Sequence, residues 1–340
     1  MHGGRLGRPH ARRIRTTRYK GERVTESPRT FQHVAVIGPG AVGLCLAVRL
    51  AQQPDGPAIT LIDRDADRAR RLSGRAIQLL SDTGDLQARL PVVLAPKTPP
   101  DLVFLATKAH QAQAAARTAR AWMGAAPLVT LQNGLGVPAD VAAVLPDTCI
   151  VVGVTYQAAN VVAEGVVHHA ANIMTHLGYE GSAPDATVDA VAAVLRGAGV
   201  PSRVERDMTS VIWQKLLVNA AINPVAALAG VRNGEVADRP ALAALAARLA
   251  EEAEVVALAA GVTLPAGRAA EVALATARAT AQNRCSMLQD LEAGRTTEVD
   301  YLNGAIVRVA RDHGMTAEAN RAVAMLVRVA SANAKREESV

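Results

Sequence analysis

The sequence predicts an α/β protein in which a Rossmann-type, doubly wound N-terminal domain is followed by an all-α C-terminal domain. Three observations predict this architecture. A glycine-rich segment with the spacing G-x-G-x-x-G joins an apolar run at 33–37 to a helical segment. Further short apolar runs alternate with helical segments up to about residue 206, which is typical of a parallel sheet covered by helices. From residue 207 to 332 the apolar pattern is helical throughout.

The charge of the chain is concentrated at its N-terminus. Residues 1–30 carry nine Lys or Arg and two Glu, whereas the other 310 residues carry 28 basic and 29 acidic side chains. We therefore expect a disordered basic extension at 1–30, a Rossmann-type domain at 31–206, a helical domain at 207–332 and a short tail at 333–340. Since the body is nearly neutral and only 2% of residues are aromatic, nucleic acid is not an expected partner.

The cysteines and the apolar segments indicate the cellular compartment of the protein. The three cysteines are far apart in sequence, no C-x-x-C occurs, and no Cys/His group has zinc spacing, so no metal site is expected. His168 and His169 are adjacent and would face opposite sides of a strand. No run of 18 uncharged apolar residues occurs, so no membrane span is expected. These features predict a reduced, cytoplasmic protein.

The glycine-rich segment is the first motif that carries chemistry. It reads Gly38, Pro39, Gly40, Ala41, Val42, Gly43, between a β-branched run at 33–37 and a helical run at 44–50. The first glycine permits a tight turn, the second lets a pyrophosphate approach the backbone, and the third lets helix and strand pack closely. The helix N-terminus then offers free N–H groups to the phosphates. A glycine turn in an unrelated strand–helix unit is the alternative.

The next strand, at 58–62, ends at two residues that favour different dinucleotides. The carboxylate of Asp63 would accept hydrogen bonds from a ribose 2′-hydroxyl, which favours NAD(H). The guanidinium of Arg64 would pair with a 2′-phosphate, which favours NADP(H). The residues alone leave this choice open.

Three more apolar strands, at 102–106, 127–131 and 149–154, end at polar residues. Lys108, Asn133 and the 156–159 loop follow them directly. Because open α/β sheets bind ligands beyond the carboxyl ends of their strands, these residues should line one cleft with the glycine loop. A solvated loop lysine is the alternative for Lys108. The 161–205 segment should add antiparallel strands and a helix near 185–198.

The helical half contains one unusual polar face. Lys215, Asn219 and Asn223 are spaced at i, i+4 and i+8 in an otherwise apolar segment, so they share one side of a helix. A buried ammonium requires polar partners, and a ligand would supply them; a network to a neighbouring helix is the alternative. Asn233 is expected in a turn. Glu298 is expected in the first turn of a helix capped by Thr296 or Thr297, as a favourable N-terminal carboxylate or as a cleft acceptor.

Taken in order, these motifs resemble the ketopantoate reductase (2-dehydropantoate 2-reductase) family over about 33–330. The matching segments are GPGAVG, TKAHQ, LQNGLG, GVTYQAAN, KLLVNAAINP, NGEV and SMLQDLEAGRTTEVDYLNG. The resemblance implies NADPH-dependent reduction of ketopantoate to (R)-pantoate, in the route to pantothenate and coenzyme A, with Lys215 as the proton donor. It also implies that the substrate is held by Lys215, Asn219, Asn223, Asn233 and Ser286. The cofactor contacts that it implies are Gly38, Pro39, Gly40, Ala41, Val42, Gly43, Lys108, Asn133, Ala159 and Glu298.

Several alternatives remain at this point. Arg64 is predicted to contact NADPH. Many family members have a small neutral residue before this arginine, whereas this chain has Asp63, and this departure keeps NADH possible as the cofactor. Another 2-keto acid could be the substrate, or the chain could be a dinucleotide-binding sensor without catalysis. Pocket shape, which decides between substrates, is not visible in a sequence. The sequence allows a monomer or a homodimer.

Overall fold

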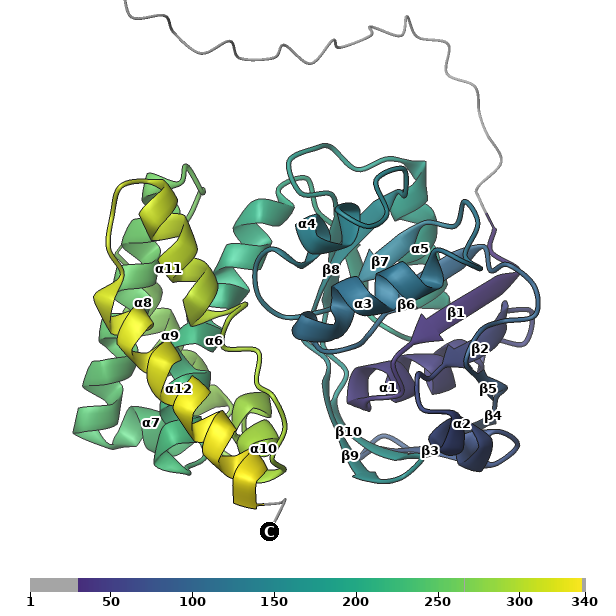
Figure 1. Ribbon diagram of the computed structural model, residues 1–340, viewed down its shortest axis with the longest axis horizontal. Helices are drawn as coiled ribbons and strands as arrows, with labels where there is room; N and C mark the ends of the chain where they lie inside the picture. The colour runs from purple at the N-terminus through teal and green to yellow at the C-terminus, as the bar shows by residue number, and fades with distance from the viewer. Residues whose placement is uncertain (1–29, 266, 338–340) are drawn as a thin grey trace, which may run out of the picture.

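A computed structural model of the chain describes residues 30–265 and 267–337. The predicted division between an α/β half and an all-helical half is confirmed, and Figure 1 shows the two halves side by side. Residues 1–29 of the predicted extension lie outside the described residues. The expected tail at 333–340 is wrong in part, because the last helix, α12 (Glu318–Glu337), continues to Glu337.

The main sheet has eight strands, and six of them form a continuous parallel arrangement. In spatial order the strands are β12 (Ser202–Val204), β11 (Thr175–Gly178), β8 (Ile150–Thr155), β7 (Leu128–Thr130), β6 (Leu102–Leu105), β1 (His33–Ile37), β2 (Ala58–Ile62) and β5 (Val92–Val93). Strand β11 runs antiparallel to β8, and all other neighbouring pairs in this sheet are parallel. The chain order reverses between β1 and β6, which places a ligand-binding crevice beyond the ends of those strands.

Both faces of the main sheet are covered, as the apolar runs require. On β1, Val34 and Val36 face one core and Ala35 and Ile37 face the other. The first core includes α1 (Ala41–Leu50) and α5 (Ala186–Gly197). The second includes α3 (Ala109–Ala119) and α4 (Val137–Ala142). The short helix α2 (Ala66–Leu72) follows β2.

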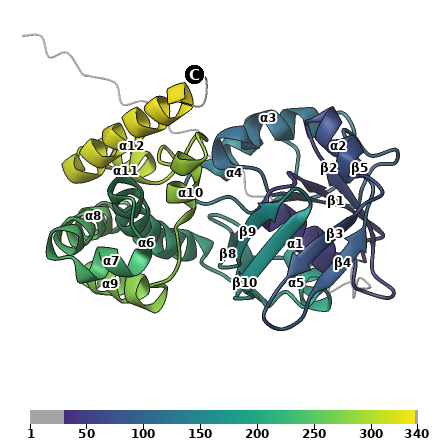
Figure 2. The same cartoon turned by 90° about the horizontal axis from the view of Figure 1, so that it is seen from below.

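A second sheet of four strands was not predicted as such. Its order is β4 (Leu86–Arg89), β3 (Ala76–Leu80), β10 (Val166–Ala171) and β9 (Ala158–Ala163). Helix α1 contacts this sheet as well as the main one, so it lies between the two sheets (Figure 2). The expected antiparallel pairing after residue 160 occurs between β9 and β10. Strands β3, β4 and β5 had no counterpart in the sequence analysis.

The helical half is built around one long helix, α6 (Met208–Ala229). The surrounding helices are α7 (Asn233–Asp238), α8 (Pro240–Ala259), α9 (Ala269–Ala279), α10 (Ser286–Glu292), α11 (Asn303–Asp312) and α12. Within the described residues, α6 is the one helix long and apolar enough to span a bilayer, but 67% of its most apolar window is buried inside the fold. Its contacts with α7, α8, α9, α10 and α12 identify it as the core helix of this half.

Candidate active site

The glycine loop has the geometry that a dinucleotide phosphate needs. Gly38 has a φ of 101°, and its N–H donates to the carbonyl of Ile62 at 2.9 Å. Gly40 is the N-cap residue of α1, and a Cβ built on it would have nothing within 4 Å. Because the first N–H groups of a helix lack intrahelical acceptors, this open backbone at the start of α1 fits a pyrophosphate.

The structure gives Asp63 and Arg64 different surroundings. The Asp63 carboxylate is buried, and Arg68 donates to it twice, from Nε at 2.5 Å and from a terminal nitrogen at 2.7 Å. Arg64 is exposed, and no hydrogen bond or ion pair joins it to residues 30–265 or 267–337. Arg68 belongs to helix α2, which follows β2. Its pairing with Asp63 leaves Arg64 as the cation available at the end of β2.

Lys215 lies on α6 where this helix meets the sheet. Its Nζ donates to the backbone carbonyl of Thr155, at the end of β8, and lies 5.2 Å from the centre of the Tyr156 ring. Burial lowers the pKa of Lys215 to about 8, while the negative charge of Glu298 acts in the opposite direction. The ammonium therefore faces the carboxyl end of β8, and its lowered pKa lies closer to neutral pH than that of an exposed lysine.

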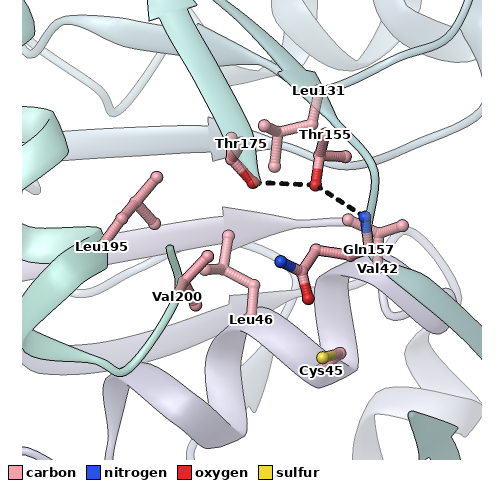
Figure 3. A pocket seen from close by; sticks show the side chains of 9 residues that line it. All are labelled: Val42, Cys45, Leu46, Leu131, Thr155, Gln157, Thr175, Leu195 and Val200. Carbon is pink, nitrogen blue, oxygen red and sulfur yellow. Dashed lines mark hydrogen bonds between the residues drawn. The ribbon is translucent and has the colours of Figure 1, made fainter. Parts of the chain in front are cut away.

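A small pocket lies behind the Thr155 end of β8. Figure 3 shows it between α1 and the strand ends, with the Thr155 hydroxyl bonded to Thr175 and accepting the backbone N–H of Gln157. Its volume is about 20 Å³, which is room for about one water molecule. This pocket is therefore too small for a nicotinamide or a keto acid.

Glu298 joins the two halves of the protein. Its carboxylate accepts the backbone N–H of Ala109, at the start of α3, at 2.8 Å and the side-chain amide of Asn133 at 3.4 Å. The expectation that Glu298 lies in the first turn of a helix is wrong. It lies in a turn five residues before α11, where the helical half contacts the α/β half. The cleft-acceptor interpretation fits this position.

Lys108 also bridges the two halves, through a residue that the sequence analysis missed. Its ammonium pairs with the Asp290 carboxylate of α10 at 2.5 Å, and Arg295 pairs with the same carboxylate at 3.0 Å. Tyr301 adds a bond from its hydroxyl to Asp140 of α4 at 2.9 Å. The segment from Asp290 to Tyr301 thus holds the two halves together. The available signal for Asp290 was a carboxylate placed between Leu288 and Leu291 in the sequence.

The predicted asparagine face of α6 is present. Asn219 and Asn223 lie on the same side of α6 as Lys215, and neither amide hydrogen-bonds to another described residue. Asn233 is the first residue of α7 rather than part of a turn. Its amide donates to Thr280 at 3.0 Å, and its buried Oδ1 has no partner in the described part of the chain.

The segment 280–286 connects these asparagines to Ser286. The backbone N–H of Asn233 donates to the carbonyl of Asn283 at 3.0 Å. The thiol of Cys285 donates to the carbonyl of Asn223 at 3.5 Å. Ser286, exposed at the start of α10, follows that cysteine directly. Two asparagines and the serine therefore gather around one segment, next to the polar face of α6.

Ala159 does not lie in the predicted loop. It is in β9, opposite His169 of β10, and it packs against the core that contains α1. The loop after β8 is shorter than expected, because the chain pairs with β10 from residue 158 onward. Ala159 is consequently beside the glycine-loop helix, on the second sheet.

Comparison with known proteins decides the family. A family model described as "Ketopantoate reductase PanE/ApbA" matches residues 34–181, and one described as "Ketopantoate reductase PanE/ApbA C terminal" matches residues 207–331. The chain belongs to the ketopantoate reductase family. A 2-dehydropantoate 2-reductase from Halobacterium salinarum is 34% identical over 300 residues, which cover 87% of this chain and 98% of that protein. The predicted family is confirmed, and so is the enzyme class, an NAD(P)H-dependent oxidoreductase.

Solved structures agree with the fold. The chain is similar to a PanE/ApbA family ketopantoate reductase from Ralstonia eutropha JMP134, with a TM-score of 0.81 and 26% identity over 89% of this chain and 100% of that one. A D-mandelate dehydrogenase solved with NADH and anilino(oxo)acetate also has a TM-score of 0.81, at 22% identity over 89% of this chain and 99% of that one. At that identity the second likeness shows the fold alone.

Among residues 30–265 and 267–337, no group of three or more His, Cys, Asp or Glu side chains could hold a metal ion. All three cysteines, Cys45, Cys149 and Cys285, are free thiols. The charged members of the candidate site are lysines, arginines and carboxylates, and its remaining polar groups are amides and hydroxyls.

Proposed function

We propose that the protein is a 2-dehydropantoate 2-reductase that uses NADPH to reduce ketopantoate to (R)-pantoate in the cytoplasm, in the route to pantothenate and coenzyme A. The observation that carries this proposal is the position of Lys215, whose ammonium points from an asparagine-bearing helix toward the strand ends next to the glycine loop. The names of the curated relatives that cover most of the chain support the same substrate.

The geometry and the family resemblance together support the following binding roles. The backbone of Gly38, Pro39, Gly40, Ala41, Val42 and Gly43 would hold the pyrophosphate. Arg64 would hold the 2′-phosphate, and Lys108, Asn133, Ala159 and Glu298 would line the rest of the cofactor site. Bound NADPH would supply a hydride to the ketone carbon. The amides of Asn219, Asn223 and Asn233 and the hydroxyl of Ser286 would orient the keto acid by neutral hydrogen bonds.

Lys215 would complete the reduction by donating a proton. As the ketone carbon gains a hydride, negative charge develops on the ketone oxygen, and an ammonium within hydrogen-bond reach stabilises it. Lys215 transfers one proton to that oxygen and becomes a neutral amine, which solvent protonates again before the next turnover. A pKa of about 8 suits this role, since the group is charged at neutral pH and still gives up its proton readily.

The first test is a substrate panel with the full-length chain. We expect NADPH oxidation with ketopantoate at a kcat/KM at least ~10-fold above that with other 2-keto acids, since pocket contacts discriminate by about this factor per methylene. A higher value with a different 2-keto acid would change the substrate within the same enzyme class. Cofactor binding without turnover of any keto acid would contradict the proposed reductase activity and favour a dinucleotide-binding sensor without catalysis.

Arg64→Ala tests the choice of cofactor. Because Arg68 neutralises Asp63 while Arg64 is unpaired among the described residues, Arg64 should be the group that binds a 2′-phosphate. We expect KM for NADPH to rise about tenfold in the variant, because one charge-assisted hydrogen bond is lost. KM for NADH should stay unchanged. Steady-state kinetics with both cofactors measure this. Arg117→Ala, an exposed arginine on α3, is the matched control, and an unchanged NADPH/NADH ratio in Arg64→Ala would place the discrimination elsewhere.

A further inference from the structure

Helix α6 contains a proline in its interior, directly after one of the proposed substrate residues. Pro224 lies five residues before Ala229, the last residue of the helix, and follows Asn223. A proline has no N–H, and its ring pushes against the carbonyl four residues earlier. The carbonyl of Ala220, next to Asn219, is therefore left without its helical donor. Both proposed substrate asparagines flank the turn that this proline disturbs.

A buried asparagine from another helix supplies the missing donor. Asn303, the first residue of α11 and fully buried, donates from its side-chain amide to the Ala220 carbonyl at 2.9 Å. The same amide nitrogen donates to Oδ1 of Asn320 at 2.9 Å. Since both partners are acceptors, the NH2 group of Asn303 must face them, which fixes the orientation of its amide.

The network continues to the far side of the helical half. Asn320 of α12, also fully buried, donates to the Leu249 carbonyl of α8 at 3.2 Å and to the Glu252 carboxylate at 2.8 Å. That carboxylate also accepts the backbone N–H groups of Ala319 and Asn320. One turn of α6 is thereby tied to three other helices through polar groups in an otherwise apolar core.

This network is not the arrangement that stability alone would favour. A helix with alanine at 224 would satisfy the Ala220 carbonyl by itself, and neither buried asparagine would be needed there. The Oδ1 atom of Asn303 is buried and has no partner among the described residues, which is itself unfavourable. Groups that reduce stability and persist in a core often serve a functional geometry.

We propose that Asn303 and Pro224 are positioning residues for the keto-acid substrate, which they influence through the turn of α6 that carries Asn219 and Asn223. Pro224 removes one backbone hydrogen bond of α6, and Asn303 binds the Ala220 carbonyl that this leaves without a helical donor. The amides of Asn219 and Asn223 then keep fixed directions relative to Lys215. This inference rests on the proposed function, because it assigns the two asparagines to the substrate.

A set of single and double variants separates an effect on substrate positioning from an effect on the stability of the protein. Asn303→Ala should lower Tm and raise KM for ketopantoate at least ~5-fold, because the Ala220 carbonyl loses its donor and the turn moves. The double variant with Pro224→Ala regains a backbone N–H for that carbonyl, so Tm should return toward the wild-type value. KM for ketopantoate should stay raised in the double variant, while KM for NADPH stays at the wild-type value.

Asn320→Ala is the matched control, since it removes an equally buried asparagine but keeps the bond between Asn303 and Ala220. We expect a lower Tm with an unchanged KM for ketopantoate. A wild-type KM in folded Asn303→Ala, full recovery of KM in the double variant, or an equal rise of KM in Asn320→Ala would each overturn the assignment.

The wild-type assay keeps the two hypotheses apart. If the wild-type protein does not reduce ketopantoate, the proposed function fails, and the inference is tested by a crystal structure of the double variant. In that structure the 219–223 turn should be displaced relative to Lys215, and an unchanged turn would overturn the inference.

Discussion

Lys215→Ala should lower kcat for ketopantoate reduction by at least ~100-fold, the usual loss when a general acid is removed. The variant would have no ammonium beside the Thr155 carbonyl and the Tyr156 ring, where the ketone oxygen gains its proton in the proposed mechanism. Stopped-flow measurement of NADPH oxidation at saturating substrate would report the chemical step directly. The affinity for NADPH should change little, because the glycine loop is on the other half of the protein.

The pH dependence of kcat identifies the same group independently. The proposed mechanism requires the protonated form of Lys215, so kcat of the wild-type enzyme should fall as pH rises through about 8, the lowered pKa of this lysine. Burial lowers that pKa by disfavouring the charged form, so the fall should begin well below the value for an exposed lysine. In Lys215→Ala the residual kcat should not fall with rising pH in this range.

Lys97→Ala provides the matched control, since Lys97 is an exposed lysine of the α/β half. It should keep the wild-type kcat and the same pH profile. Circular dichroism and Tm would establish that Lys215→Ala is folded. Turnover near the wild-type rate in a folded Lys215→Ala protein would remove the lysine from proton transfer and leave it as a substrate contact.

The parts of the site that lie within one element could be predicted from sequence. The glycine loop is defined by a strand, a turn and a helix that are neighbours in the chain. Lys215, Asn219 and Asn223 share a face because helical periodicity alone puts them there. Short-range geometry therefore specified both the phosphate-binding turn and the polar face of α6, before any tertiary contact was known.

The contacts that join distant segments could not be predicted in the same way. Lys108 and Asp290 are 182 residues apart, and Asn303 is 83 residues from the carbonyl that it binds. Asp63 and Arg68 are close in sequence, but only the turn into α2 shows that the arginine folds back onto the carboxylate. The second sheet was missed because β3 and β4 are short, and because β3 joins the sheet through β10, a distant segment of the chain.

Gly40→Ala should weaken NADPH binding without destabilising the protein. The φ of Gly40 is −82°, which any residue adopts, and a Cβ there would have nothing of the protein within 4 Å. The added methyl group would instead occupy the space through which a pyrophosphate approaches the backbone. We expect KM for NADPH to rise at least ~10-fold with an unchanged Tm, measured by steady-state kinetics and calorimetry.

Gly43→Ala is the matched variant with the opposite pattern. A Cβ at this position would lie 2.0 Å from the carbonyl oxygen of Gly38, which is backbone and cannot turn aside as a side chain would. The helix would have to move away from β1, and overpacking of this kind destabilises by about 1–3 kcal/mol. Tm should therefore fall in Gly43→Ala and not in Gly40→Ala. If both variants lost stability equally and Gly40→Ala bound NADPH normally, the open backbone at the start of α1 would not be a phosphate site.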